Sequence, residues 1–448
     1  MTVVFFERSP FMAVEFLDLL KEFTIASYDE DLAYKFLQER WPLYSFGNSD
    51  FSVGIGNDTA VERMLTKKTF TARLQLDGSK VTALFFYMNA QINKAASDAG
   101  FGLLLPPYEI QERLGSKFHI EDICTKLRLL KNKSITFSSE TDLKEVFPRC
   151  VSELGLPFVI QGPEGVSGED TFLIKNVSEL DIAAQTLKCG FKAAKFIKRN
   201  IPLSVHVCIE KEILVVRGPF IQLIGFPELA TSPYQFCGND TNQSLLTTKI
   251  IEKVNEISAQ VAEYARSQGY MGVLGIDFLW DTESNGIYLQ ELNTRFTGLT
   301  RLLTGMQKDQ NNYPDVLRHL ETFGYSNFHD GVEDMDKNTE LNLSLHEYAQ
   351  LIITNIDTTE VVISKSISPG VYQYRNNSLY LTGRSLFLSE IEKNDILLAY
   401  VTPIGRRVRS GGVLARILLK RSALMHEAYE LDPHIKELII SFRQLIIT

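Results

Sequence analysis

The sequence predicts a mixed α/β protein built from several packed subdomains. Its 448 residues exceed the size at which one hydrophobic core keeps growing, so two to four subdomains are expected. Strand-like runs alternate with helical stretches over the first hundred residues, which is typical of an α/β layer. The strongest single pattern is a hairpin, with apolar strands at 273–280 and 286–292 around a turn-rich segment.

Composition indicates a soluble globular protein, with 44% hydrophobic and 23% charged residues and no low-complexity tract. The formal charge is −9 and basic residues are dispersed, which argues against nucleic acid as a partner because phosphate-backbone binding needs a concentrated positive surface. The five cysteines lack metal-site spacing, and no apolar run reaches the length of about 18 residues that crosses a membrane. We therefore expect a cytoplasmic protein with reduced thiols and no membrane contact.

Residues 1–110 are predicted to form an N-terminal α/β domain. Strands are expected at 3–6 and 81–87, and a helix at 90–99. The Pro-Pro pair at 106–107 interrupts this pattern, and 108–130 is predicted to be mostly helical. A central subdomain is expected over 111–200, with strands at 158–161 and 171–174, a glycine-containing loop between them, and a helix at about 179–189.

The remaining chain is predicted as a third region over 201–335 and a mixed α/β accessory domain over 336–448. In the third region we expect strands at 203–209 and 212–216, with 220–224 as an option. An amphipathic helix at 248–268 is expected to end at Gly269. The accessory domain is predicted to contain strands at 360–367, 370–374, 395–401 and 413–419, a loop at 405–412, and a C-terminal helix.

Polar side chains lie at the end of the second strand of the 273–292 hairpin and directly after it. Because side chains alternate between the faces of a strand, Glu291, Asn293 and Arg295 are predicted to share one face, which begins at Leu289, while Leu292 points away.

Asp277, on the preceding strand, could lie beside this row. Two carboxylates and an amide oxygen would then converge, and such hard oxygen ligands suit magnesium. The alternative interpretation is a solvated hairpin face that carries ordinary charged residues.

The segments Gly-Val-Leu-Gly-Ile-Asp-Phe at 272–278 and Gln-Glu-Leu-Asn-Thr-Arg-Phe-Thr-Gly at 290–298 resemble the metal-binding hairpin of the ATP-grasp superfamily. The resemblance covers roughly residues 1–310. It implies an ATP-grasp fold with an N-terminal pre-ATP-grasp domain and a C-terminal extension. It also implies that Asp277, Glu291 and Asn293 bind two magnesium ions, with manganese as an alternative, and that Arg295 contacts the transferred phosphoryl group or a tetrahedral intermediate.

The same resemblance implies two phosphate contacts. Lys117 occupies the place of a first phosphate-binding lysine, although an ordinary exposed lysine on a helix is an equally good interpretation. Gln161 stands where relatives usually have a second such lysine. A glutamine can donate a hydrogen bond to a phosphate but carries no charge, so nucleotide binding is expected either to rely on the amide or to be weakened.

The remaining nucleotide contacts are implied by position. The loop 162–171 resembles a glycine-rich lid over the phosphates, where Gly168 would let the backbone approach an anion and Ser167 would add a hydroxyl; a plain turn is the alternative. Lys195, Phe196 and Ile197 lie at the hinge that offers backbone groups to adenine. The following strand carries polar residues that we expect to be structural.

The implied function is an ATP-dependent ligase that activates a carboxylate as an acyl-phosphate, joins it to an amine, and releases ADP and phosphate. The motifs resemble those of peptide ligases more than those of carboxylases, so small amino-acid-like or carrier-bound substrates are expected, with a thiol or carbon acid as another acceptor. Relatives are often dimers, which makes a homodimer one option. A non-catalytic nucleotide-binding or carrier-interacting module is the alternative. The basic cluster Arg406, Arg407 and Arg409 is either an acidic-substrate site or a solvated hairpin tip.

Overall fold

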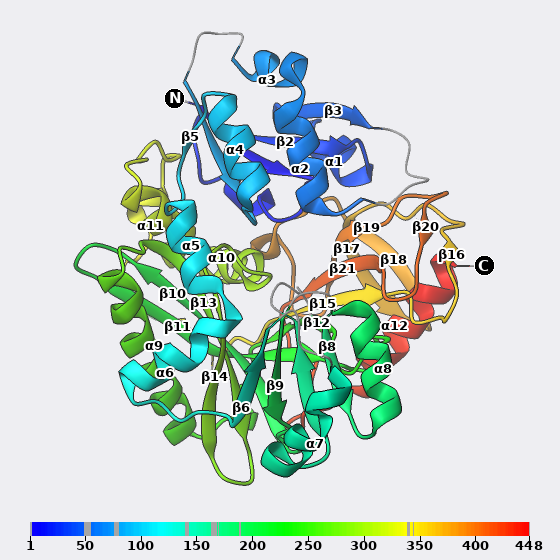
Figure 1. The fold of residues 1–448 in the computed structure, drawn as a ribbon. Helices are drawn as coiled ribbons and strands as arrows, with labels where there is room; N and C mark the ends of the chain where they lie inside the picture. Colours follow the sequence, from blue (N-terminus) through cyan, green and yellow to red (C-terminus); the bar gives the residue numbers. More distant parts are fainter. Residues whose placement is uncertain are drawn as a thin grey trace.

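Three sheets of four or more strands organise the part of the chain that the computed structural model describes (Figure 1). The described residues are 2–48, 55–75, 80–138, 143–162, 168, 170–187, 190–337, 341–343 and 345–447. A parallel sheet forms the N-terminal domain, a four-stranded antiparallel sheet forms a small subdomain, and a ten-stranded antiparallel sheet spans the rest. The mixed α/β class predicted from the sequence is confirmed.

The N-terminal sheet has the strand order β3-β2-β1-β4-β5, with all neighbours parallel. Its strands are β1 (Thr2–Glu7), β2 (Phe23–Asp29), β3 (Tyr44–Asn48), β4 (Val81–Phe85) and β5 (Gly102–Leu103), with helices α1 (Leu32–Leu37), α2 (Asn57–Thr66), α3 (Lys68–Leu74) and α4 (Ala90–Asp98). Every residue of β2 and β4 is buried, as expected for parallel strands covered on both faces. Strand order reverses at β1, so the loops after β1 and β4 border the place where such sheets hold ligands.

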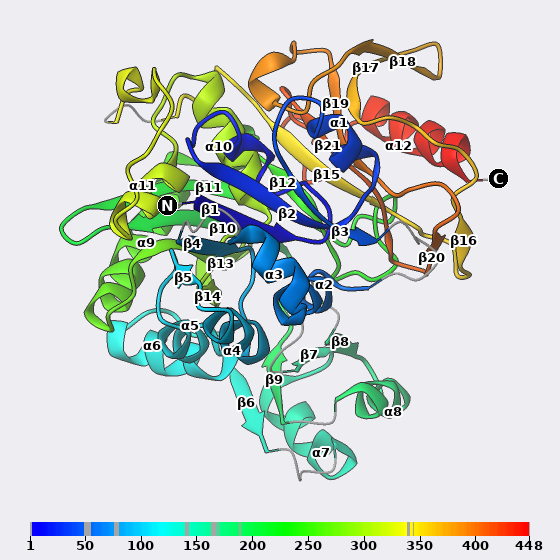
Figure 2. The same cartoon turned by 90° about the horizontal axis from the view of Figure 1, so that it is seen from above.

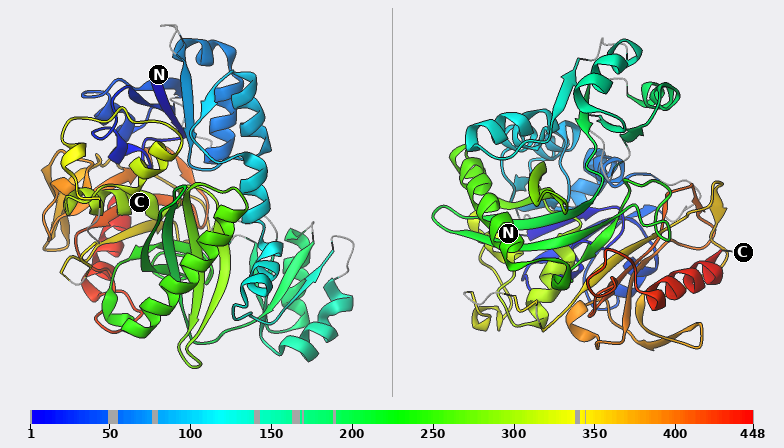
Figure 3. Two further views of the ribbon diagram at one scale, coloured as in Figure 1. Left: turned by 90° about the vertical axis from the view of Figure 1, so that its left-hand side faces the viewer. Right: turned by 90° about the horizontal axis from the view of Figure 1, so that it is seen from below.

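A small subdomain projects from the body of the molecule (Figures 2 and 3). It follows α5 (Tyr108–Gly115) and α6 (Ile120–Leu127), and comprises β6 (Ser134–Phe137), α7 (Leu143–Leu154), β7 (Phe158–Gln161), β8 (Thr171–Ile174), α8 (Val177–Thr186) and β9 (Phe191–Lys195), with the sheet order β6-β9-β7-β8. Apolar residues of α7 and α8 pack on one face of this sheet in a separate core. The opposite face is left without helices of the subdomain itself.

The ten-stranded sheet has the order β14-β13-β10-β11-β12-β15-β21-β19-β17-β18. Its strands are β10 (Asn200–Ile209), β11 (Leu214–Ile224), β12 (Phe236–Asp240), β13 (Gly272–Asp281), β14 (Gly286–Asn293), β15 (Ala349–Thr354), β17 (Gly370–Arg375), β18 (Ser378–Gly383), β19 (Ile396–Val401) and β21 (Val413–Leu419); the helices are α9 (Thr248–Ser267), α10 (Leu299–Asp309), α11 (Asp315–Thr322) and α12 (Pro433–Ile446). β12 belongs to the region predicted over 201–335 and β15 to the accessory domain predicted over 336–448. Because these two strands pair, the two regions share one sheet. Helix α9 packs on one face, and Val273 and Phe296 join the N-terminal core.

Several predicted elements differ in extent from those observed. The strands expected at 212–216 and 220–224 form one strand, β11, because a bulge opposite β10 carries the chain past Pro219. The 108–130 helix is broken at Ser116, where the backbone is extended. Helix α8 begins at Val177 rather than 179, because Asn176 caps it. The strand expected at 360–367 is reduced to β16 (Val361–Val362), which pairs only with β20 (Arg407–Val408).

Within the described residues, no helix combines the length and apolar character needed to cross a membrane. The cysteines that the structure describes are free and buried: Cys124, Cys150, Cys208 and Cys237.

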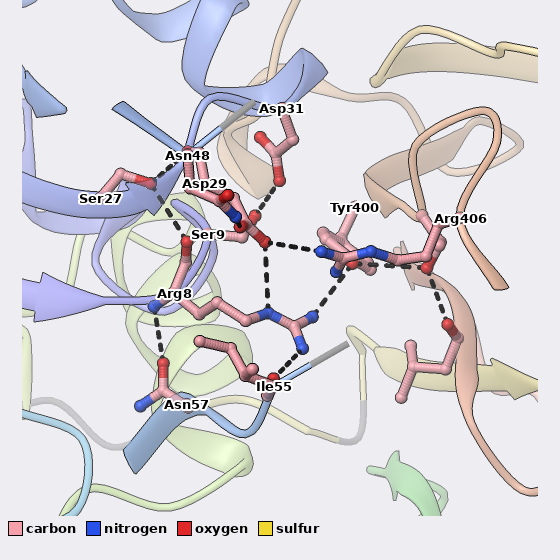
Figure 4. Close-up of polar contacts among 12 residues, drawn as sticks. Arg8, Ser9, Ser27, Asp29, Asp31, Asn48, Ile55, Asn57, Tyr400 and Arg406 are labelled. Atoms are coloured by element: carbon pink, nitrogen blue, oxygen red, sulfur yellow. Dashed lines mark hydrogen bonds and ion pairs between the residues drawn. The ribbon is translucent and has the colours of Figure 1, made fainter. Parts of the chain in front are cut away.

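A polar network ties the N-terminal domain to the C-terminal part of the large sheet (Figure 4). Arg8 follows β1 and donates to the carbonyl of Ile55 at 2.7 Å and to the hydroxyl of Tyr400 at 3.2 Å. Asp29, at the end of β2, lies 3.5 Å from Arg8 Nε and 3.4 Å from Arg406 Nη2. Arg406 is therefore a buried structural residue, and neither sequence interpretation of the basic cluster describes it.

Replacing Asp29 by Asn is expected to lower the free energy of unfolding by about 3 kcal/mol, because it leaves the buried guanidinium of Arg406 and the partly buried guanidinium of Arg8 without their carboxylate. Urea unfolding followed by tryptophan fluorescence measures the change. The matched control is Asp330→Asn, whose carboxylate is exposed beside Lys21 and is expected to leave the stability close to that of the wild type. Equal stabilities of the two variants would contradict the structural role of the network.

A buried histidine joins α11 to β13 and to the N-terminal domain. His319 Nδ1 accepts from Val273 N at 3.0 Å, and Nε2 lies 2.8 Å from the carbonyl of Leu104, so the ring is a neutral donor and acceptor. Burial lowers the pKa of His319 to about 4. The neutral His319 ring contributes fully to stability above the ordinary histidine pKa of 6.5, and this contribution is lost as pH falls towards 4. In that range the histidine is protonated in the unfolded chain but stays neutral in the folded protein.

The expected loss for this histidine is on the order of 3 kcal/mol by pH 4. Urea unfolding between pH 7.5 and 4.5 is compared for the wild type and His319→Gln, which cannot titrate at this position. A smaller loss of stability with acid in the variant is expected, and identical pH dependence would contradict this assignment.

Candidate functional site

The bulged hairpin of β13 and β14 places the main candidate residues. Asp277 pairs with Glu291, whereas the next residue, Phe278, pairs with Leu289, so Gln290 is an extra residue on β14. The bulge reverses the alternation, and Leu289 lies with Phe278 in the apolar core under α9. The prediction that Leu289 shares the face of Glu291 is therefore wrong, because strict period-two alternation does not cross a bulge.

Asp277 is the centre of a hydrogen-bonded group. Gln222 Nε2 donates to its Oδ1 at 2.9 Å, Asn293 Nδ2 donates to its Oδ2 at 2.8 Å, and the Ser204 hydroxyl adds another hydrogen bond. The pKa of Asp277 is raised to about 6, first because the protein removes water from the carboxylate and second because Glu291 is close. Ser204 thus touches the site, and Gln222 is a site residue that the sequence did not indicate.

Asn293 and Arg295 continue this group at the end of β14. Arg295 Nη2 donates to Asn293 Oδ1 at 2.9 Å, and Nη1 donates to the carbonyl of Phe296 at 3.1 Å. The guanidinium carbon also lies 5.3 Å from the ring centre of Phe86 and 5.9 Å from that of Tyr87, in the loop that follows β4. The N-terminal domain therefore contributes to the surroundings of the hairpin.

The chemistry of these donors fits a hard divalent cation. Asp277, Glu291 and Asn293 offer carboxylate and amide oxygens from neighbouring positions on two strands. No group of three or more His, Cys, Asp or Glu side chains able to hold a metal occurs among the described residues. The hairpin set has two carboxylates and one amide, so it suits an ion that keeps some of its own water and takes other ligands from a bound anion.

The predicted phosphate contacts come from two elements. Lys117 lies in a short 3₁₀ turn between α5 and α6, and Gln161 ends β7. Gly168 has φ +81° and lies against the loop between β11 and β12: a Cβ at this position would be 2.1 Å from the carbonyl oxygen of Tyr234. Only glycine fits this approach. Ser167 lies outside the described residues.

The predicted adenine hinge follows β9. Lys195 N donates to the carbonyl of Lys133, and its own carbonyl accepts from Asn132 Nδ2 at 2.9 Å. The carbonyl of Ile197 accepts from Asn200 Nδ2 at 2.6 Å. Backbone groups of Lys195 and Ile197 are therefore already hydrogen-bonded within the protein. Among the described residues, no hydrogen bond uses the backbone of Phe196.

Many solved structures have a similar arrangement of strands and helices. The biotin carboxylase domain of 2-oxoglutarate carboxylase from Hydrogenobacter thermophilus, in complex with MgADP, aligns with a TM-score of 0.62 and 14% identity over 94% of this chain and 86% of that chain. Biotin carboxylase from Campylobacter jejuni gives 0.62 and 15% identity over 94% and 87%. N5-carboxyaminoimidazole ribonucleotide synthetase from Thermotoga maritima gives 0.54 and 13% identity over 100% and 98%. The chain has the ATP-grasp fold.

No family model matches the sequence. The ATP-grasp assignment therefore rests on the architecture, and it covers nearly the full length of both the chain and the similar structures. Among the separately predicted parts, the hairpin carboxylates belong to the ten-stranded sheet, whereas the end of β7 and the hinge after β9 belong to the small subdomain that projects from the body (Figure 3). The basic cluster is divided, since Arg406 pairs with Asp29 while Arg407 is exposed beside Glu360.

Proposed function

We propose that this protein is an ATP-dependent ligase that activates a carboxylate as an acyl-phosphate and joins it to an amine. The observation that carries the proposal is the bulged hairpin, which gathers Asp277, Glu291, Asn293 and Arg295 at the junction of the sheet with the N-terminal domain. Bound magnesium would neutralise the triphosphate of ATP. Similar structures were solved with MgADP and with ATP, which supports ATP as the nucleotide.

The proposed reaction needs only ATP, a carboxylate and an amine. A carboxylate oxygen of the substrate attacks the γ-phosphorus, the bond to the β-phosphate oxygen breaks, and ADP leaves. The amine then attacks the acyl carbon, the carbon–oxygen bond to phosphate breaks, and the amine loses a proton to solvent. Most of the acceleration comes from placement and charge stabilisation, because the groups that react belong to the substrates.

Arg295 is proposed to stabilise the negative charge that develops during both steps. Its guanidinium is held by Asn293 and by the carbonyl of Phe296, so its orientation is fixed before substrates bind. Gln222 is proposed to orient Asp277, because it fixes one carboxylate oxygen at 2.9 Å. The nearby loops after β1 and β4 are proposed to hold the carboxylate substrate, since they border the ligand-binding edge of the parallel sheet.

The amine acceptor is tested by phosphate release from ATP in the presence of magnesium and pooled amino acids, with product mass measured for each active pool. We expect release that depends on both a carboxylate and an amine. Asn293→Ala is the negative control, because it removes an amide from the proposed magnesium site. Nucleotide binding without stimulated release would instead support a non-catalytic nucleotide-binding module, and release with a thiol or carbon acid alone would overturn the amine acceptor.

A further inference from the structure

The open face of the small subdomain carries a row of polar residues in direct register. Thr136 on β6 pairs with Lys192 on β9, Lys192 pairs with Gln161 on β7, and Gln161 pairs with Thr171 on β8. Side chains at paired positions point to the same face, with Cβ atoms about 4.5–5.5 Å apart. The apolar residues of the alternate positions pack under α7 and α8, so this row lies on the face without those helices.

Lys192 is the charged residue of this row. It is half-buried, yet its side chain makes no hydrogen bond or ion pair with any residue that the structure describes. The pKa of Lys192 is lowered, mainly because the protein removes water from the ammonium group, and the positive charge of Lys117 acts in the same direction. Two lysines from different elements therefore lie close enough to repel each other.

Glu121 is an acidic residue whose charge acts on Lys192, but it forms no ion pair with this lysine. Glu121, on α6, raises the pKa of Lys192 by its charge, but its Oε1 accepts from the Ser134 hydroxyl and no ion pair within 4 Å joins it to Lys192. An ammonium group withdrawn from water without a paired carboxylate is costly, so an anionic ligand on this face would remove that cost.

We propose that Lys192 binds the phosphates of the nucleotide, and that it provides from β9 the positive charge that Gln161 does not provide from β7. The proposal rests on the proposed function, since it assigns a further contact to the same nucleotide. Lys192 and Gln161 occupy paired positions, so the lysine reaches the same region as a charged residue at 161 would. Lys117, whose charge acts on Lys192, adds a second positive charge.

The test measures binding by calorimetry, with magnesium present, of a non-hydrolysable ATP analogue and of adenosine. Lys192→Met is expected to weaken binding of the analogue by about tenfold to a hundredfold and to leave adenosine binding unchanged, because only the analogue carries phosphates. The control is Lys175→Met, which removes an exposed lysine of the same subdomain and is expected to bind both ligands like the wild type.

A second variant moves the charge to the paired strand. Gln161→Lys with Lys192→Gln keeps one lysine and one glutamine in the row and is expected to bind the analogue within about threefold of the wild type. Unchanged analogue binding by Lys192→Met, or an equal loss of analogue and adenosine binding, would overturn the role of Lys192 and leave the ligase proposal intact. Absence of analogue binding by the wild type would overturn both.

Discussion

Glu291→Gln is expected to reduce ATP turnover by about a thousandfold while the protein stays folded. The substitution keeps the size of the side chain but removes a negative charge beside Asp277, and a magnesium ligand that loses its charge no longer holds the triphosphate in the reactive position. Glu291 is partly exposed on β14, so the loss of charge is not expected to disturb the core. Phosphate release under saturating ATP measures the effect, and thermal unfolding checks the fold.

The same hairpin supplies a matched control. Glu283→Gln makes the identical change in the exposed turn, where the carboxylate lies 3.2 Å from Arg199 and far along the strands from the paired acidic residues. This control is expected to retain wild-type turnover. If Glu291→Gln also retained turnover, the hairpin could not be the site of phosphoryl transfer.

Arg295→Lys is expected to lower turnover by about a hundredfold with little change in nucleotide affinity. Arginine holds Asn293 Oδ1 and the carbonyl of Phe296 with separate nitrogens and also lies over the ring of Phe86, and a lysine cannot reproduce this planar geometry. Removal of one preoriented donor to developing charge typically costs about 10² to 10³ in rate. Single-turnover phosphate release separates this effect from nucleotide binding.

Arg199→Lys is the control for this substitution, because its side chain is exposed at the turn end of the same sheet. It is expected to leave turnover unchanged. Wild-type turnover in Arg295→Lys would show that the planar guanidinium geometry is not needed in the reaction, whereas parallel losses of affinity and turnover would indicate a binding role.

The sequence was most informative where one segment determines its own structure. The 273–292 hairpin follows from alternating apolar residues around a polar turn, and the structure places Asp277 and Glu291 opposite each other as predicted. The helix expected at 248–268 is observed as α9 (Thr248–Ser267), because its apolar stripe and the cap at Thr247 are both local signals.

Features that depend on pairing between distant segments were not predictable in this way. The bulge at Gln290 arises from the match of β14 to β13, and the local pattern of β14 does not reveal it. Gln222 reaches Asp277 only because β10 lies between β11 and β13 in the sheet. Lys192 stands beside Gln161 through a register set by strands about 30 residues apart, so the missing charge at 161 could not be matched to it from the sequence.

The strands β2 and β15 were not predicted from the sequence. β2 and β15 bury every residue, so they lack the alternation of polar and apolar positions that marks a strand with one exposed face. The buried pairing of Arg406 with Asp29 was likewise hidden, because the partners are far apart in the chain and come from different domains. A run of arginines alone does not indicate which of them points inward.

The account depends most directly on divalent-cation binding at Asp277, Glu291 and Asn293. Electron paramagnetic resonance of Mn²⁺ tests this dependence with the non-hydrolysable ATP analogue, the wild type and Glu291→Gln. We predict that the wild type with the analogue removes more of the free-ion signal than the analogue removes alone, and that Glu291→Gln with the analogue removes no more than the analogue alone. Equal uptake of Mn²⁺ by the wild type and the variant would contradict the proposed site.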